Sequence, residues 1–320
     1  MKPNRAQMRI GIDLGGTKTE VIVLNAMGDV LLRDRVPTPS HDYYAILDTI
    51  QSLVARAQVI TGPVPQIGVG MPGAADQHTG LIKNANTTCL IGQPLEKDLT
   101  LKLGCPVVLE NDANCFVLSE AVDGAAANDN TVFGVILGTG VGGGLAFNQT
   151  LWTGLHHIAG EWGHNPIPLR FTPASPSGSA TLNSAPWVGL GRPCYCGRTD
   201  CVETHLCGRG LVQTWTHLSQ HPAPEELSVP WIVNQAKQGD PTSSQTLDLY
   251  AQQLACALST IINLLDPDAI VLGGGLSQLP DLASNVQNWL PQFVFNTRVD
   301  TSILIAAHGD SSGVRGAAWL

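Results

Sequence analysis

The chain has 320 residues, 43% of them apolar, and carries a formal net charge of −9 at pH 7. This length is enough for two ordinary domains or for one large domain divided by a cleft. The acidic balance argues against a nucleic-acid-binding surface, which needs clustered Lys and Arg. No run of about 18 unbroken apolar residues occurs, and the polar segment Met1–Gln7 does not have the pattern of a signal peptide. We therefore expect a cytoplasmic protein that binds neither nucleic acid nor membrane.

Two segments of the chain share a pattern of apolar strand, glycine turn and apolar strand. They are Arg9–Leu24, which turns at Gly15-Gly16, and Val132–Phe147. Such a repeated unit favours two lobes of similar plan. Because strands and helices alternate, the whole pattern predicts an α/β fold with largely buried sheets. The other expected elements are helices over Tyr44–Val59, Ala113–Asp123 and Gln245–Leu265, and strands over Gln66–Met71, Pro106–Glu110 and Ala269–Leu272.

The first glycine turn has the composition of a phosphate-binding loop. Glycine lets backbone N–H groups approach a phosphate closely because it has no Cβ. Asp13, at the end of the first strand, is placed to bind Mg²⁺ through water. One such turn is more often an ordinary hairpin, but the matched second turn and the turn at Gly273–Gly275 favour a phosphate site. The candidate residues for the phosphates and their metal are Asp13, Gly15, Gly16, Thr17, Lys18, Thr139, Gly140 and Gly274.

Asp112 lies where an expected strand ends and an expected helix begins. Transfer of a phosphoryl group to a hydroxyl needs a side chain that orients the hydroxyl and accepts its proton. Asp and Asn are also favoured helix caps. On these residues alone the capping role is slightly favoured over the catalytic one.

Three closely spaced cysteines indicate a metal site. Cys194, Cys196 and Cys201 are too few for a tetrahedral zinc ion, which needs a fourth ligand. His164 can provide it, across a segment of Ser, Pro and Gly over 170–192 that predicts an irregular surface excursion. Four protein ligands would make the zinc structural. Unliganded, reduced thiols are the less favoured alternative.

Together these motifs resemble the ROK family of repressors and sugar kinases along nearly the whole chain. The resemblance implies an actin-like (ribonuclease H-like) kinase fold of two α/β lobes with a central cleft. The first lobe would span 1–122, joined by a C-terminal helix over 311–320, and the second 123–310. The motifs are DLGGTK at Asp13–Lys18, ENDAN at Glu110–Asn114, GTGVGGG at Gly138–Gly144, EWGH at Glu161–His164, CYCGRTDCVE at Cys194–Glu203 and GGG at Gly273–Gly275.

The same resemblance implies ATP-dependent phosphorylation of a hexose at its 6-hydroxyl, with ATP, Mg²⁺ and Zn²⁺ as cofactors. Asp112 would then be the catalytic base, which reverses the ranking above. His164 would serve twice, as zinc ligand and as sugar ligand. The sugar-binding residues would be Gly73, Asn86, Asn111, Glu161, His164 and Glu203.

Within the family the chain resembles bacterial fructokinases that also accept mannose, through segments Lys83–Leu99 and His308–Leu320. We therefore expect D-fructose as the main substrate, mannose as a secondary one and N-acetylglucosamine as a poor one. A glucokinase or an N-acetylglucosamine kinase of the same family is the alternative. Departures from the family pattern are Asp200 where Gly is usual, Cys207 where Ser is common, and a longer excursion between His164 and Cys194.

Sugar-sensing repressors and actin-like assembly proteins are two other classes of protein that share part of these sequence features. A sugar-sensing repressor would carry a helix-turn-helix domain ahead of the first glycine turn, and we expect none. An actin-like assembly protein would not need the EWGH and cysteine motifs. We also expect a homodimer.

Overall fold

The computed structural model describes residues 8–76, 78–85, 87–168, 186–219 and 221–320. The candidate sugar ligand Asn86 and most of the predicted excursion over 170–192 lie outside these ranges. The chain forms two compact units. Unit 1 comprises Met1–Gly134, Gly144–Gly160 and Ala306–Leu320, and unit 2 comprises Val135–Gly143 and Glu161–Ile305. The lobe boundaries drawn from the sequence stay predictions.

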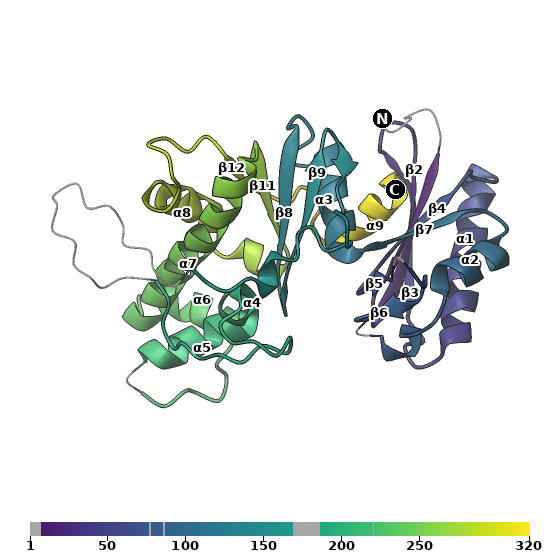
Figure 1. The fold of residues 1–320 in the computed structure, drawn as a ribbon. Coiled ribbons are helices and arrows are strands. Elements are labelled where there is room, and N and C mark those ends of the chain that lie inside the picture. The colour runs from purple at the N-terminus through teal and green to yellow at the C-terminus, as the bar shows by residue number, and fades with distance from the viewer. Residues whose placement is uncertain (1–7, 77, 86, 169–185, 220) are drawn as a thin grey trace. The chain divides into compact units, whose positions relative to one another are not determined.

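Unit 1 is built on a five-stranded sheet in the order β3-β2-β1-β4-β7 (Figure 1). β2 is antiparallel to β1 and β3, whereas β1, β4 and β7 run parallel to one another. A short antiparallel hairpin, β5 with β6, follows β4. The strands are β1 (Arg9–Leu14), β2 (Lys18–Leu24), β3 (Val30–Pro37), β4 (Ile67–Met71), β5 (Ala74–Ala75), β6 (Ile82–Lys83) and β7 (Val107–Asn111).

Side chains of β2 alternate between two hydrophobic cores, as the period of a strand requires. Val21 and Val23 belong to the core that α1 and α2 cover, and Ile22 and Leu24 belong to the core under α3 and α9 (Figure 1). The helices of unit 1 are α1 (Tyr43–Thr61), α2 (Leu95–Leu103), α3 (Asp112–Val122) and α9 (Ser312–Trp319), with 3₁₀ turns at Thr88–Leu90 and Gly309–Ser311.

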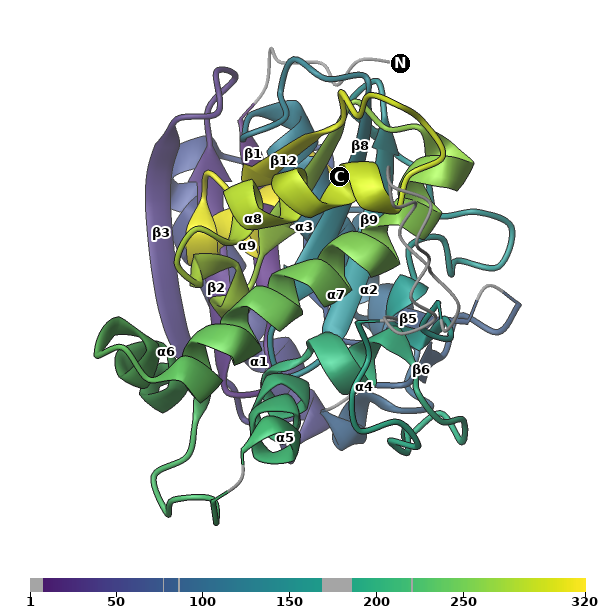
Figure 2. The ribbon, with the colours of Figure 1, turned by 90° about the vertical axis from the view of Figure 1, so that its left-hand side faces the viewer.

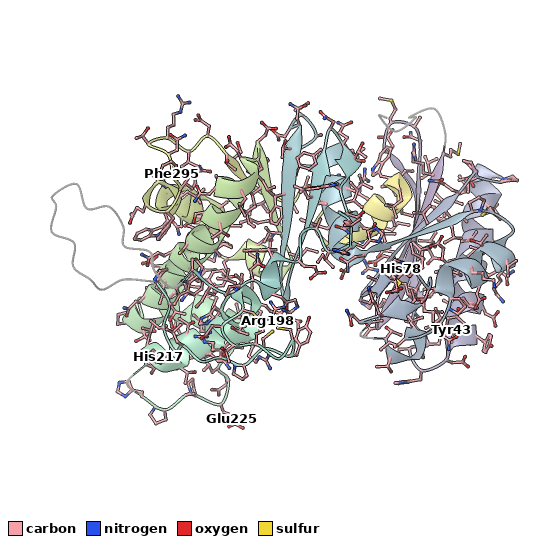
Figure 3. All side chains as sticks on the ribbon, in the orientation of Figure 1. Tyr43, His78, Arg198, His217, Glu225 and Phe295 are labelled. Carbon is pink, nitrogen blue, oxygen red and sulfur yellow. The ribbon has the colours of Figure 1, made fainter. Side chains whose placement is uncertain are left out.

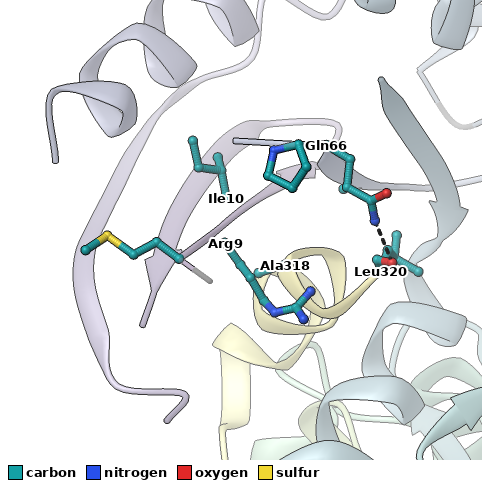
Figure 4. Close-up of a pocket in the computed structure, with 8 residues that line it drawn as sticks. Arg9, Ile10, Gln66, Ala318 and Leu320 are labelled. Carbon is teal, nitrogen blue, oxygen red and sulfur yellow. Dashed lines mark hydrogen bonds between the residues drawn. The ribbon is translucent and has the colours of Figure 1, made fainter. Parts of the chain in front are cut away.

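Helix α9 lies directly on the backbone of its neighbours in unit 1. A Cβ at Gly68 of β4 would overlap the carbonyl of Ala317, and one at Gly316 would overlap the carbonyl of Cys115. The chain end is also held, since Gln66 Nε2 donates to the Leu320 carbonyl at 2.9 Å beside a small pocket (Figure 4). The last helix is therefore an integral part of unit 1.

The second sheet has the order β10-β9-β8-β11-β12, and its strands β8 and β9 contribute residues to both units. β11 and β12 are parallel. Helix α7 extends past α5 and α6, with α8 beside it (Figure 2). The elements are β8 (Thr131–Leu137), β9 (Val141–Phe147), β10 (Thr150–Leu151), β11 (Ala269–Gly273), β12 (Ser302–Ile305), α4 (Val202–Leu206), α5 (Gly208–Leu218), α6 (Val229–Lys237), α7 (Pro241–Leu265) and α8 (Leu282–Trp289), with 3₁₀ turns at Trp162–His164, Gly275–Gln278 and Leu290–Gln292.

The expected helices and strands are confirmed, with one large difference at an element end. Helix α7 begins at Pro241, ahead of the predicted Gln245, because the Asp240 side chain caps it by accepting from the Ser243 N–H at 2.7 Å. Proline at the first helical position is compatible with such a start. Over the described ranges, every helix is too short or too polar to cross a bilayer.

Candidate functional site

The first glycine turn joins β1 to β2, and residues close in sequence hold its shape. The Gly15 N–H donates to the Lys18 carbonyl at 3.0 Å. Thr38, at the end of β3, donates its N–H to the Thr17 carbonyl at 3.0 Å and its hydroxyl to the Gly15 carbonyl at 2.8 Å. Gly16, Thr17 and Lys18 are exposed. The predicted phosphate loop is therefore a fixed turn with an open outer side.

Asp13 lies at the end of β1 among other acidic groups. Burial, and after it the nearby carboxylates of Asp112 and Glu20, raise its pKa from 3.8 to about 7, against a smaller opposite effect of Arg35. A divalent cation would relieve this repulsion, because it favours the ionised form of the carboxylates around it. The surroundings of Asp13 thus suit the Mg²⁺ role that the sequence predicts.

Helix α3 begins beside Asp13 with the pair Asn111-Asp112. Asn111 fills the N-cap position, since its side-chain oxygen accepts from the Ala113 N–H at 2.8 Å. Its amide nitrogen donates to the Gly73 carbonyl at 3.1 Å. Asp112 is exposed, and its Oδ1 also accepts from Ala113 at 2.8 Å. Because Asn111 already caps the helix, a capping role does not account for Asp112.

Glu110 is the first residue of the ENDAN motif, and no role was predicted for it. Its Oε1 accepts from the Asn111 N–H at 2.8 Å and from Asn114 Nδ2 at 2.9 Å. Both bonds fix the junction between β7 and α3. Glu110 therefore orients the backbone that carries Asp112.

The second glycine turn, between β8 and β9, is held by residues from distant parts of unit 2. The Val141 N–H donates to Glu203 Oε2 at 3.0 Å. The Gly208 N–H donates to the Gly138 carbonyl at 2.9 Å. Gly274, at φ +80°, packs so closely on Leu137 that a Cβ would overlap the backbone there. The candidate residues Thr139, Gly140 and Gly274 thus lie in one region of unit 2.

The four predicted zinc ligands come together in unit 2. The ligand atoms of His164, Cys194, Cys196 and Cys201 all lie within 4.8 Å of one another. Cys194 Sγ is 3.5 Å from His164 Nδ1, and Cys196 Sγ is 3.6 Å from Cys201 Sγ. Bond lengths of about 2.0–2.3 Å in a tetrahedron put ligand atoms roughly 3.5–3.8 Å apart. The donor set and these two distances are therefore compatible with a structural zinc site.

His164 faces this cluster with one ring nitrogen and the Tyr195 hydroxyl with the other. The Nε2 to Tyr195 distance is 2.8 Å, and the two rings meet edge to face. Tyr195 is 83% exposed. No role was predicted for Tyr195, because the sequence shows only that it lies between two cysteines. Arg198, in the same loop (Figure 3), donates to the His164 carbonyl at 3.1 Å.

The structure gives a reason for one departure from the family pattern, Asp200 in place of the usual glycine. Asp200 has a left-handed φ of 53°, which favours glycine. Its carboxylate accepts from the N–H groups of Gly191 and Arg192 at 2.8 and 3.1 Å, and lies 3.0 Å from His205 Nε2. These bonds offset the backbone strain and tie the cysteine loop to helix α4, which carries Glu203.

The structure brings the candidate residues together in two sets, one in each unit. Unit 1 holds the first glycine turn with Gly73, Asn111 and Asp112, and unit 2 holds the second turn with Glu161, His164 and Glu203. Trp162, between Glu161 and His164, donates its ring N–H to the Gly142 carbonyl at 3.0 Å. The sugar-ligand motif and the second glycine turn are therefore packed against each other.

A model of the ROK family matches residues 9–320. An N-acetyl-D-glucosamine kinase from Escherichia fergusonii is 37% identical over 316 residues, which are 98% of this chain and 99% of the relative. Among solved structures, the ROK hexokinase of Thermus thermophilus superposes with a TM-score of 0.81 at 26% identity, over 98% of this chain and 97% of that one. A ROK family glucokinase from Streptomyces griseus, solved with glucose and AMPPNP, superposes with a TM-score of 0.73 at 27% identity, over 97% of this chain and 98% of that one.

These matches extend over nearly all of the chain and of each relative, and they confirm the actin-like kinase fold. This chain belongs to the ROK family and is one of its sugar kinases.

Proposed function

We propose that the protein transfers the γ-phosphoryl group of ATP to the 6-hydroxyl of N-acetyl-D-glucosamine. Relatives described as N-acetyl-D-glucosamine kinases, 37–38% identical over 98% of the chain, are the observation that carries this choice of sugar. The proposal replaces the expectation that D-fructose is the main substrate and N-acetylglucosamine a poor one. That expectation rested on two segments, Lys83–Leu99 and His308–Leu320, and on no side chain whose chemistry selects a ketose.

Asp112 is the proposed general base. Its carboxylate is exposed at the start of α3, and its backbone is fixed by the cap at Asn111 and by Glu110. In the reaction it accepts the proton of the sugar 6-hydroxyl while the oxygen forms a bond to the γ-phosphorus and the bond to the departing ADP breaks. A fixed carboxylate of this kind contributes about 10²–10⁴-fold to the rate.

The two glycine turns are the proposed phosphate ligands. Gly16 and Thr17 present exposed backbone on an open turn, and Thr139 is exposed in the second turn. A Mg²⁺ ion near Asp13 would neutralise phosphate charge, which suits a carboxylate whose pKa is raised to about 7 without it. The proposed cofactors are therefore ATP and Mg²⁺.

Glu161, His164 and Glu203 are the proposed ligands of the sugar hydroxyls. The zinc ion would hold His164 by Nδ1, and thereby the segment that carries Glu161. Nε2 of His164 bonds the Tyr195 hydroxyl at 2.8 Å, so a sugar hydroxyl that binds His164 would take the place of this contact. The zinc thus supplies position rather than chemistry.

A panel of sugars tests the proposal. ADP release is measured with N-acetyl-D-glucosamine, glucose, mannose and D-fructose, and 6-deoxy-N-acetylglucosamine serves as the matched control that lacks the acceptor hydroxyl. We expect N-acetyl-D-glucosamine to have the highest kcat/KM, about 10-fold or more above glucose, because an unpaired buried polar group costs about 1–3 kcal/mol. A higher value for fructose or glucose would overturn the choice of sugar. Turnover with the 6-deoxy compound would overturn the site of phosphorylation.

A further inference from the structure

Glu203 makes a contact that binding of a sugar does not require. Its Oε2 accepts the backbone N–H of Val141 at 3.0 Å, across 62 residues of sequence. Val141 is the first residue of β9 and follows the second glycine turn directly. One proposed sugar ligand is therefore bonded to a proposed phosphate-binding turn.

Gly140 makes this contact possible. A Cβ on Gly140 would lie 2.6 Å from Glu203 Oε2, which is closer than real side chains approach. A Cβ on Gly138, two residues earlier, would have no atom within 4 Å. Replacing Gly140 by alanine should therefore disturb the contact with Glu203. The same replacement at Gly138 should change only the flexibility of the turn.

The carboxylate has one oxygen engaged and one left for a ligand. Within the described ranges, Oε1 of Glu203 has no hydrogen-bond partner, whereas Oε2 is bonded to Val141. Glu203 is half-buried. A carboxylate can accept several hydrogen bonds at once. Oε1 can therefore bind a sugar hydroxyl while Oε2 stays on the backbone.

We propose that Glu203 is a positioning residue for the nucleotide as well as a ligand for the sugar. Its Oε2 holds the Gly138–Val141 turn in the shape that binds phosphate. A sugar hydroxyl on Oε1 fixes the carboxylate in this orientation, so the sugar strengthens nucleotide binding. The coupling is reciprocal, because each ligand changes the affinity of the other by the same factor. This inference rests on the proposed function in that Glu203 must bind the sugar.

The first experiment measures nucleotide affinity with no sugar present. A non-hydrolysable ATP analogue is titrated calorimetrically, with Mg²⁺, into the zinc-loaded wild type and into Glu203→Ala and Glu203→Gln. We expect the alanine variant to bind about 10-fold more weakly, since the Val141 N–H loses its charged acceptor. The glutamine variant should remain near the wild type, because its amide oxygen still accepts the Val141 N–H. A residue that served the sugar alone would leave all three affinities equal, and that result would overturn the proposal.

The second experiment measures the coupling itself. Analogue affinity is compared with and without saturating N-acetyl-D-glucosamine, or with whichever sugar of the panel the wild type phosphorylates. We expect the sugar to tighten nucleotide binding about 5-fold or more in the wild type. Gly140→Ala, whose methyl displaces Oε2, should bring this factor close to one. Gly138→Ala is the matched control and should retain the factor, whatever it does to affinity alone.

The outcomes separate this inference from the proposed function. If no sugar of the panel is phosphorylated, the proposed function fails, and the sugar-free titrations still decide whether Glu203 positions the turn. If sugars are phosphorylated but the coupling persists in Gly140→Ala, the inference fails and the proposed function stands. Zinc content and thermal stability confirm that each variant is folded. Should Gly140→Ala not fold, the sugar-free titrations of Glu203→Ala and Glu203→Gln decide the inference.

Discussion

The two glycine turns follow the same strand–turn–strand pattern but are supported in different ways. The first is held by its own backbone and by Thr38, all within the β1–β3 part of unit 1. The second is held by Glu203, Gly208 and Gly274, far along the chain in unit 2. The first turn should therefore keep its shape when the rest of the site changes. The second should depend on the zinc loop and on helix α4.

Removal of the proposed zinc ion should have the largest effect on the site. Of the two glycine turns, only the second should change. Structural zinc sites contribute on the order of 10 kcal/mol of apparent binding energy, and Cys201 directly precedes the helix that carries Glu203. After chelation, hydrogen exchange should accelerate over Val141–Phe147 and change little over Arg9–Leu14. Sugar affinity should fall more than nucleotide affinity, because the first turn is untouched.

The matched variants for this experiment are Cys194→Ser and Cys256→Ser. Both cysteines are buried, but Cys256 lies outside the cluster. Only the first substitution should lower the zinc content and the melting temperature substantially. Active, carefully purified protein with almost no zinc would contradict the assignment of the site.

Replacement of the base should have the next largest effect, confined to the chemical step. Asp112→Asn keeps the shape of the side chain and removes the proton acceptor, so kcat should fall about 10²–10⁴-fold. The melting temperature should stay close to that of the wild type, because Asn111 caps α3. Near-normal turnover in a folded variant would show that Asp112 is not the base.

Equal glycine substitutions in the two regions should have unequal costs in stability. Gly274→Ala adds a methyl that overlaps the backbone of Leu137 at a φ of +80°, so the free energy of unfolding should fall by about 3 kcal/mol. Gly16→Ala meets only the Thr87 hydroxyl, at 3.6 Å, and should cost little. Thermal denaturation without ligands compares the two. A larger loss at Gly16 would reverse the ranking of the turns.

The smallest expected effect is a pH dependence that belongs to the first turn. Because the pKa of Asp13 is about 7 in the folded chain and near 3.8 when exposed, the folded state retains a proton that the unfolded state loses. The free energy of unfolding should therefore fall as pH rises from about 4 to 7. Asp13→Asn removes this dependence, so without Mg²⁺ the variant should be more stable than the wild type at pH 8 and about equally stable at pH 4. Equal stabilities at both pH values would contradict the burial of this charge.

The glycine turns and the gathering of His164 with the three cysteines could be predicted because their signals are local or of fixed composition. A strand–turn–strand pattern is visible within sixteen or so residues. Cys194, Cys196 and Cys201 are close in sequence, and tetrahedral coordination requires a fourth ligand such as His164. The choice of sugar could not be predicted in this way, because hexoses differ in single hydroxyl positions that such motifs do not encode.

The sequence by itself determined the α/β pattern, the two turns, the candidate residues of the His–Cys₃ cluster and the family. Only the tertiary structure decided that Asn111 caps α3, that Tyr195 bonds His164, and that Glu203 holds Val141. The physical reason is that these roles are hydrogen bonds made through individual atoms. A backbone N–H has no side chain to mark it, and a bond between residues 62 positions apart leaves no periodicity in the sequence.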